Sequence, residues 1–186
     1  MSLIISDNMK KRGLFIGRFN PPHLGHFKAL EEILRENAVD EVIIGIGSAQ
    51  ESYTQMNPFT AGERFEMILA GLKELNLFNE NILVVPLLDI NNNNQWVSYI
   101  LSILPHFEFV YSNNPLVKLL IDKNPQLEIL DIKLIKRNEF SSTNIRKKII
   151  IEDESWKELV PKSIVNVIID LQGINRIKTL STNDLA

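Results

Sequence analysis

The stretch that decides the fold is Gly13–His26, which reads GLFIGRFNPPHLGH. Its first five residues are apolar or glycine, as is typical of a short buried strand. The segment His23–Glu36 then places Phe27 and Leu30 on one face at helical spacing. A strand that leads through a short loop into a helix is the opening of a βα unit.

The same alternation of strand and helix continues along the chain. Further strands are predicted at Asp40–Gly47, Ile82–Leu88, Phe107–Tyr111 and Leu127–Leu130. Helices are predicted from Ala61 (apolar face Phe65, Ile68, Leu69 and Leu72), then at Asn94–Leu104, Pro115–Ile121, Thr143–Ile151 and Pro161–Leu171. Thr60 and Glu63 form the capping box of the first of these, and Gly173 is expected to end the last. We therefore predict an α/β fold, a Rossmann-like doubly wound parallel sheet of five strands with a helical C-terminal part.

Length and composition restrict the classes of protein that the chain can form. Its 186 residues fit one domain, expected over residues 13–178, with a flexible lead-in at 1–12 and a tail at 179–186. The absence of cysteine excludes disulfides, thiolate zinc sites and a cysteine nucleophile, and it fits a cytoplasmic protein. A net charge of -3 without a basic block argues against nucleic acid as a partner. No apolar run approaches the roughly 18 residues of a membrane span, so no membrane partner is expected.

The junction between the first strand and the first helix carries the candidate chemistry. In a doubly wound sheet such a helix start offers free backbone N–H groups to an anion. His23 and His26 lie three residues apart on one face of the helix, Gly25 permits close approach, and Arg18 adds a permanent cation. These groups suit a triphosphate. The histidine pair also arises by chance or as half of a metal site, although it lacks the glutamate of an H-E-x-x-H motif.

GRFNPPHLGH resembles the (H/T)-x-G-H signature of the nucleotidyltransferase superfamily, and Phe140–Arg146 (FSSTNIR) resembles its second, phosphate-binding motif. This resemblance implies that His23, His26, Arg18 and Arg146 are catalytic. It further implies an ATP site made of Gly17, Arg18, His23, His26, Ser112, Asn114, Ser142, Thr143 and Arg146. Arg137 is either an additional phosphate ligand or a solvated charge.

Four further segments are similar to archaeal-type nicotinamide-nucleotide adenylyltransferases: Gly47–Gln50, Asn57–Arg64, Asp89–Trp96 and Asn113–Val117. The resemblance implies that the Ile90 backbone and Asn93 bind the nicotinamide carboxamide and that Trp96 stacks on the ring. An aromatic face attracts a cationic pyridinium, and an asparagine offers both a donor and an acceptor to an amide. On its own, Trp96 also fits a core position, and the asparagine tract fits a plain helix-start loop. Met56 stands where the family usually carries a phosphate-binding arginine.

The implied reaction transfers AMP from ATP to nicotinamide mononucleotide (NMN), giving NAD and pyrophosphate. Mg²⁺ is expected to arrive with ATP, with no metal site of the protein's own and no tightly bound organic cofactor. The family's closed homo-oligomers, often hexamers, imply a homo-oligomer here. The alternatives are a relative acting on phosphopantetheine, a flavin mononucleotide or an alcohol phosphate, a non-catalytic nucleotide sensor, and an RNA-binding domain. Preference between NMN and nicotinic acid mononucleotide stays open.

Overall fold

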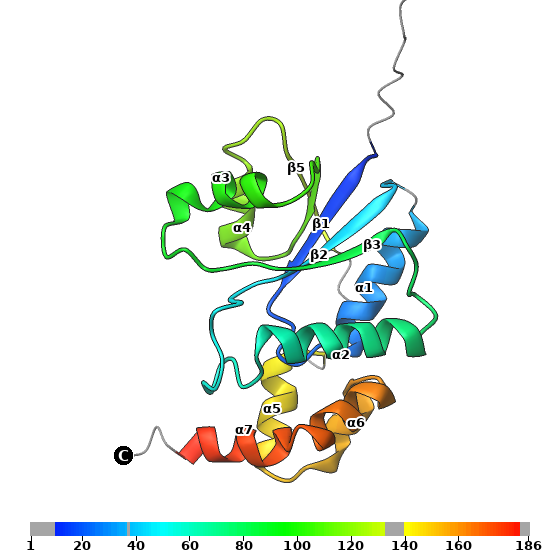
Figure 1. Ribbon diagram of the computed structural model, residues 1–186, viewed down its shortest axis with the longest axis vertical. Helices are drawn as coiled ribbons and strands as arrows, with labels where there is room; N and C mark the ends of the chain where they lie inside the picture. The colour runs from blue at the N-terminus through cyan, green and yellow to red at the C-terminus, as the bar shows by residue number, and fades with distance from the viewer. Residues whose placement is uncertain (1–9, 37, 133–139, 183–186) are drawn as a thin grey trace, which may run out of the picture.

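The computed structural model describes residues 10–36, 38–132 and 140–182. Strands and helices alternate through most of this chain (Figure 1). The elements are β1 (Arg12–Gly17), α1 (Leu24–Arg35), β2 (Glu41–Ile46), α2 (Ala61–Glu74), β3 (Ile82–Pro86), α3 (Asn93–Ile103), β4 (Phe109–Tyr111), α4 (Pro115–Ile121), β5 (Glu128–Leu130), α5 (Ser142–Ile150), the 3₁₀ helix η1 (Glu154–Leu159), α6 (Lys162–Asp170) and α7 (Gly173–Thr182).

The five strands form one parallel sheet in the order β3-β2-β1-β4-β5. The order reverses direction at β1, so a crevice opens between β1 and β4 at their carboxyl ends. β4 pairs with β1 only as far as Phe15, whereas β2 stays paired with β1 as far as Gly17. The chain therefore leaves β4 early, which widens the crevice. The predicted doubly wound sheet is confirmed.

Alternating side chains of the strands serve two separate cores, because successive residues of a strand point to opposite faces. Phe15 and Ile44 pack in one apolar cluster with α1 and α2, while Leu14 and Ile43 pack in another with α3 and α4. Helices thus cover both faces of the sheet, as the continuous apolar strands predict.

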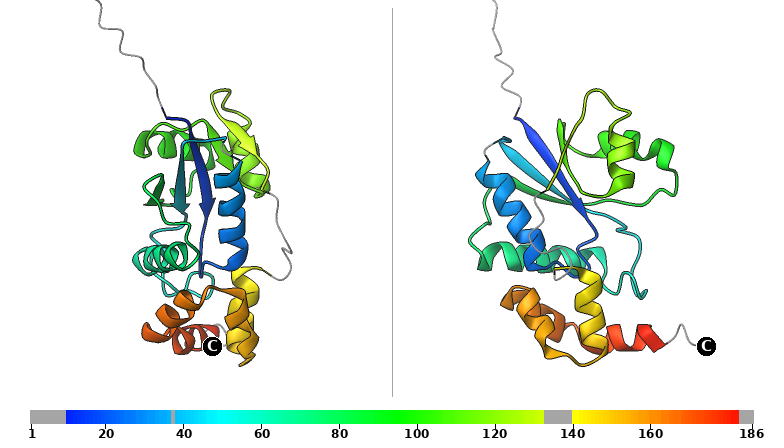
Figure 2. Two further views of the ribbon diagram at one scale, coloured as in Figure 1. Left: turned by 90° about the vertical axis from the view of Figure 1, so that its right-hand side faces the viewer. Right: turned by 180° about the vertical axis from the view of Figure 1, so that it is seen from behind.

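The C-terminal helices α5, α6 and α7 gather beyond the carboxyl ends of β1 and β2 (Figures 1 and 2). Gly173 was expected to end a helix, and that prediction is wrong, because Gly173 begins α7. The left-handed residue at this turn is Gln172, with φ 53°. Gly173 is required for packing instead, since a Cβ there would lie 2.7 Å from the Phe59 ring. The short helix η1 was not predicted.

Helix α2 begins as expected and faces the core differently than expected. The capping box is confirmed: the Glu63 amide donates to Thr60 Oγ1 at 3.2 Å, and the Thr60 amide donates to Glu63 Oε2 at 2.8 Å. Phe65, predicted on the apolar face, is 37% exposed, while Arg64 and Met67 are fully buried. Arg64 was not on the predicted apolar face, but carbonyl groups of neighbouring loops accept hydrogen bonds from its guanidinium inside the protein.

The ends of the described chain extend slightly beyond the predicted domain limits. β1 begins at Arg12 and α7 continues to Thr182, so both reach past the expected range of residues 13–178. The expectation for the lead-in falls mainly on residues 1–9, which lie outside the described residues. Within the ranges described, no helix combines the length and apolar character needed to cross a membrane.

Candidate active site

Two adjoining cavities, each of about 520 Å³, lie at the carboxyl ends of the strands. They share a wall made of Ile16, Gly17, Arg18, Ser112 and Asn114. The residues predicted to bind ATP all line the first cavity: Gly17, Arg18, His23, His26, Ser112, Asn114, Ser142, Thr143 and Arg146. The residues predicted to bind NMN, which are Ile90, Asn93 and Trp96, all line the second. The fold therefore places the residues predicted to bind ATP around one cavity and those predicted to bind NMN around the other.

His23 and His26 form a stacked pair at the start of α1. His23 is the residue before the helix, and the two ring centroids lie 3.6 Å apart. The His23 amide donates to His26 Nδ1 at 3.2 Å. That nitrogen is therefore an acceptor, so a neutral His26 carries its proton on Nε2 and presents an N–H donor.

Burial keeps both imidazoles neutral. It lowers the pKa of His23 from 6.5 to about 3. Burial also lowers the pKa of His26 well below 6.5, with a smaller contribution from the neighbouring His23. Nδ1 of His23 is buried and has no hydrogen-bond partner among the described residues. At neutral pH this pair therefore supplies hydrogen bonds to a ligand rather than protons to a reaction.

Helix α5 brings the second motif against the first. Ser141 caps it by accepting from the Asn144 amide at 3.1 Å. Ser142 Oγ donates to the Pro21 carbonyl at 2.9 Å, and a guanidinium nitrogen of Arg146 donates to the Asn20 carbonyl at 2.8 Å. These two bonds lock the N-terminal turn of α5 onto the loop between β1 and α1. His26 and Arg146, far apart in sequence, consequently line the same cavity.

Gly25 allows this contact between the two motifs. A Cβ at this position would lie 2.8 Å from Cβ of Phe140, two residues before the start of α5, and 3.1 Å from the His23 ring. The first distance is shorter than real Cβ contacts and the second is tight, so a side chain at position 25 would push Phe140, and with it the second motif, away from α1. The sequence indicated close approach at Gly25, and the partner is the second motif.

The first cavity is strongly cationic. In the part of the chain that the structure describes, neither Arg18 nor Arg146 forms an ion pair with a carboxylate, and no acidic side chain lines the cavity. Burial, together with the charge of Arg18, lowers the pKa of Arg146 to about 10, so its guanidinium stays charged at neutral pH. Two uncompensated cations beside a helix N-terminus favour a polyanion.

The second cavity is more open and mostly lined by amides. Asn93, the first residue of α3, is exposed, and its side chain makes no hydrogen bond within the described ranges. Trp96, half-buried one turn later, lines the cavity and also packs against the core of α3 and α4. Asp89 accepts from Ser48 Oγ at 2.5 Å, which joins the loops after β2 and β3.

Comparison with known proteins agrees with this site. The pattern of the cytidylyltransferase-like family matches residues 14–148. A nicotinamide-nucleotide adenylyltransferase of Thermococcus kodakarensis is 45% identical over 94% of this chain and 91% of its own length. One of Methanococcus aeolicus is 48% identical over 93% of this chain and 96% of its own length. The chain belongs to the cytidylyltransferase-like family and is a relative of the nicotinamide-nucleotide adenylyltransferases.

Solved structures share the fold at lower sequence identity. A bifunctional NMN adenylyltransferase/ADP ribose pyrophosphatase from Francisella tularensis superposes with a TM-score of 0.73 at 21% identity. That match covers 92% of this chain but only 53% of the bifunctional protein. A nicotinic acid mononucleotide adenylyltransferase from Plasmodium falciparum superposes with a TM-score of 0.63 at 13% identity.

Two buried polar residues of the protein, Asn20 and Arg64, were not assigned to the site from the sequence. The Asn20 side chain accepts from the Phe59 amide at 3.1 Å and donates to the Phe59 carbonyl at 3.2 Å. The Arg64 guanidinium donates to the carbonyls of Arg18 and Gly47 at 2.9 and 2.8 Å. Both residues sit inside motifs noted for their resemblance, which was the available signal. Their role is to hold the loops that carry the site.

The substitution at position 56 lies on the site's edge. Met56 lines the first cavity and is 49% exposed. An apolar side chain thus stands where the family resemblance led us to expect a phosphate-binding arginine. Arg137, considered as an extra phosphate ligand, lies outside the described residues.

Proposed function

We propose that this protein transfers the adenylyl group of ATP to nicotinamide mononucleotide, forming NAD and releasing pyrophosphate. The observation that carries the proposal is the pairing of two adjoining cavities. One is cationic and lined by His23, His26 and Arg146, and the other presents Trp96 and Asn93. Relatives at about 45% identity over most of their length bear the same activity in their names.

In the proposed reaction, an oxygen of the NMN phosphate attacks the α-phosphorus of ATP. The bond between that phosphorus and the oxygen bridging to the β-phosphate breaks, and pyrophosphate leaves. The attacking phosphate is already ionised near neutral pH, so the protein needs no nucleophile or general base. Catalysis then consists of positioning the two substrates and neutralising the charge that develops at the α-phosphorus.

Most of the residues assigned to ATP have a distinct part in this scheme. His26, fixed with Nε2–H as donor, hydrogen-bonds the oxygens of the α-phosphate as their charge increases. Arg146 and Arg18 neutralise the triphosphate, while the N-terminal turn of α5 donates the backbone N–H groups of Ser142 and Thr143 and the Thr143 hydroxyl to its outer phosphates. Ser112 and Asn114, after β4, line the side assigned to the adenosine.

In the second cavity we propose that Trp96 stacks on the pyridinium ring and that Asn93 with the Ile90 backbone binds the carboxamide. No partner for the Asn93 side chain or the Ile90 peptide exists within the described residues. Their hydrogen-bonding capacity therefore remains free for a ligand amide. The Trp96 ring lines this cavity, and an aromatic face attracts a positively charged ring.

Mg²⁺ belongs to the proposal as the partner of ATP. Among the residues described, no three His, Cys, Asp or Glu side chains come close enough to hold a metal, and none of the acidic ones lines the first cavity. The site therefore fits an ion that enters with the nucleotide, held by phosphate oxygens and water. Its chemical contribution when bound is to neutralise phosphate charge.

A cytoplasmic location and a homo-oligomeric state complete the proposal. The location rests on the cysteine-free composition, and the assembly rests on the family resemblance alone. Light scattering after gel filtration measures the mass of the assembly and so tests the homo-oligomeric state. A mass of a single 21.3 kDa chain would contradict it.

One experiment tests the central proposal. The protein is incubated with ATP and Mg²⁺ together with NMN, nicotinic acid mononucleotide, FMN or phosphopantetheine, and pyrophosphate and dinucleotide are measured. NAD formation from NMN, lost in His26→Ala, is the expected result. Product from FMN or phosphopantetheine alone would assign the protein to another reaction of the superfamily, and ATP binding without turnover would identify a sensor.

A further inference from the structure

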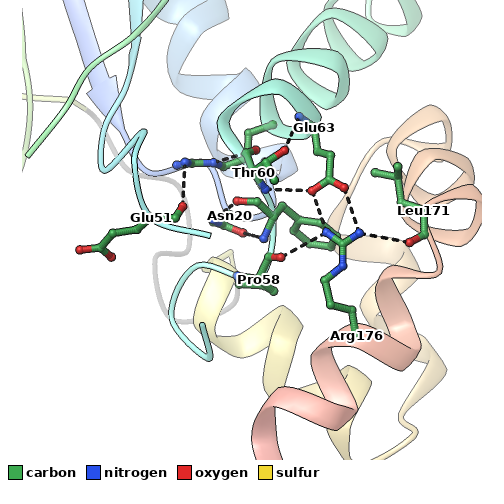
Figure 3. A network of polar contacts seen from close by, with 9 residues as sticks. Asn20, Glu51, Pro58, Thr60, Glu63, Leu171 and Arg176 are labelled. Carbon is green, nitrogen blue, oxygen red and sulfur yellow. Dashed lines mark hydrogen bonds and ion pairs between the residues drawn. The ribbon is translucent and has the colours of Figure 1, made fainter. Parts of the chain in front are cut away.

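Arg176, on the C-terminal helix α7, is the centre of a network of polar contacts away from both cavities (Figure 3). Its guanidinium binds the Glu63 carboxylate through two nitrogens, at 2.7 and 2.9 Å. The same group donates to the carbonyls of Pro58 at 3.3 Å and Leu171 at 3.4 Å. Its flat face lies over the Tyr53 ring, 4.7 Å from the centroid. One side chain therefore joins α7 to the outer part and the last residues of a loop and to the start of helix α2.

The segment that Arg176 contacts, residues 48–59, is the loop between β2 and α2, and it borders both cavities. Met56 lines the first cavity, while Ser48 and Glu51 line the second. Tyr53, in the outer part of this loop, is 56% exposed and has a φ of 56°. An exposed residue in the left-handed region needs an external contact to keep one conformation, and Arg176 provides it.

The base of the same loop is tied to the site by Arg64. Among the described residues its guanidinium forms no ion pair with a carboxylate, and it donates instead to the carbonyls of Ser48 and Glu51 at 3.0 and 3.5 Å, and to that of Arg18 at 2.9 Å. Its Nε donates to the Thr60 carbonyl at 3.2 Å. Glu63, the partner of Arg176, closes the capping box on that same Thr60. Arg176 and Arg64 are therefore both bonded to the end of the loop and the start of α2, Arg64 through the Thr60 carbonyl and Arg176 through the Pro58 carbonyl and Glu63.

Electrostatics favour a lasting contact. The side chains of Arg176 and Glu63 are only 17% and 15% exposed, so water screens their attraction weakly. Burial would raise the pKa of Glu63, but the hydrogen bonds from Arg176 and the Thr60 amide outweigh it and lower that pKa. The hydrogen bond to Glu63 in turn raises the pKa of Arg176. A two-pronged arginine pair also fixes orientation, which a lysine cannot do.

We propose that Arg176 is a positioning residue for both substrates: it holds the 48–59 loop in the conformation that forms the rims of the two cavities. The C-terminal helix is thereby part of the active-site scaffold and not only a cover for the core. This inference rests on the proposed function for its kinetic readout. Arg176 itself lines neither cavity and touches no reacting group.

The test compares Arg176→Gln, Arg176→Lys and Tyr53→Ala with a matched control on the same helix. Lys178→Gln is that control, because Lys178 pairs at 2.7 Å with the exposed Glu152 and its side chain makes no hydrogen bond or ion pair with the loop among the described residues. In Arg176→Gln we expect kcat/KM for each nucleotide to fall about tenfold, mostly through KM, because a shifted rim weakens binding before it disturbs the reacting groups. Arg176→Lys should recover part of the loss. Tyr53→Ala should raise KM with little change in melting temperature, since the ring is exposed.

A second readout is independent of activity. Amide hydrogen exchange of residues 48–59 should be faster in Arg176→Gln than in wild type, and unchanged in Lys178→Gln. All assays are run well below each variant's melting temperature. Unchanged exchange and unchanged KM in a folded Arg176→Gln would overturn the inference, as would an equal loss in Lys178→Gln. If wild type makes no dinucleotide but the exchange result holds, the proposed function fails while the loop's anchor stands.

Discussion

The two cavities are built to different degrees of rigidity, although they share a wall. In the first, three of the side chains assigned to the triphosphate are themselves held: His26 by the His23 amide, Arg146 by the Asn20 carbonyl, Ser142 by the Pro21 carbonyl. In the second, Asn93 is exposed and unpartnered within the described chain, and Trp96 is only half-buried. Groups that stabilise a transition state must be fixed before the reaction, whereas ring recognition can be completed by the ligand.

The largest effect is expected from removing a fixed group of the first cavity. Arg146→Ala should lower kcat/KM by about 10²- to 10³-fold, or about 2.7–4 kcal/mol, as for removal of one preorganised donor. Arg146→Lys should stay impaired, because an ammonium cannot keep the Asn20 carbonyl and a phosphate together. Steady-state NAD formation measures both, with thermal melting to confirm folding. Activity of Arg146→Ala within about threefold of wild type would remove this residue from the mechanism.

A second prediction uses the acid sensitivity of the histidine pair. The pKa of His23 is about 3 in the folded protein and 6.5 as the ordinary value, so between these limits the unfolded chain binds more protons. The free energy of unfolding should therefore fall as pH decreases below 6.5, by up to about 1.4 kcal/mol per pH unit for this group. Urea unfolding between pH 7 and 5, where most carboxylates stay ionised, measures the slope.

His23→Gln should flatten that slope, because it removes the group that must stay unprotonated. Trp96→Ala, in the cavity without a histidine, should keep the wild-type slope and serves as the control. An identical slope in wild type and His23→Gln would show that the imidazole is not held neutral by burial.

A third prediction separates the cavities by substrate. Trp96→Ala should raise KM for NMN about five- to thirtyfold, corresponding to about 1–2 kcal/mol of lost stacking on a cation, with KM for ATP nearly unchanged. The KM of Trp96→Phe for NMN should lie between those of wild type and Trp96→Ala. Because Trp96 also packs against the core, melting temperatures are compared first. An equal rise in both KM values would mean that the two cavities do not bind separate substrates.

The smallest effect concerns the rim of the first cavity. Met56→Arg should lower KM for one nucleotide about two- to fivefold, because an exposed charge contact is worth at most about 1 kcal/mol. The gain should shrink as salt is added, and Met56→Gln should behave like wild type. A gain that does not respond to salt would point to a change in loop conformation instead of a phosphate contact.

Much of this molecule was decided locally. The alternating strands and helices, the Thr60–Glu63 capping box and the two phosphate motifs depend on neighbours within a few residues, so they can be read from sequence. Gly173 and Phe65 could not, because each depends on what lies across the fold. Gly173 packs against Phe59. On α2, Arg64 and Met67 are buried in the protein, while Phe65 is partly exposed.

The sequence by itself determined which groups the site contains: two imidazoles, two guanidiniums, a helix N-terminus and an aromatic ring. Only the tertiary structure decided that they meet, through α5 docking on the Asn20–Pro21 peptide carbonyls and through Arg64 and Arg176 holding the 48–59 loop. The physical reason is that local periodicity depends on which side chains face inward. The partner of a buried guanidinium depends on carbonyls that the folded chain brings together from distant positions.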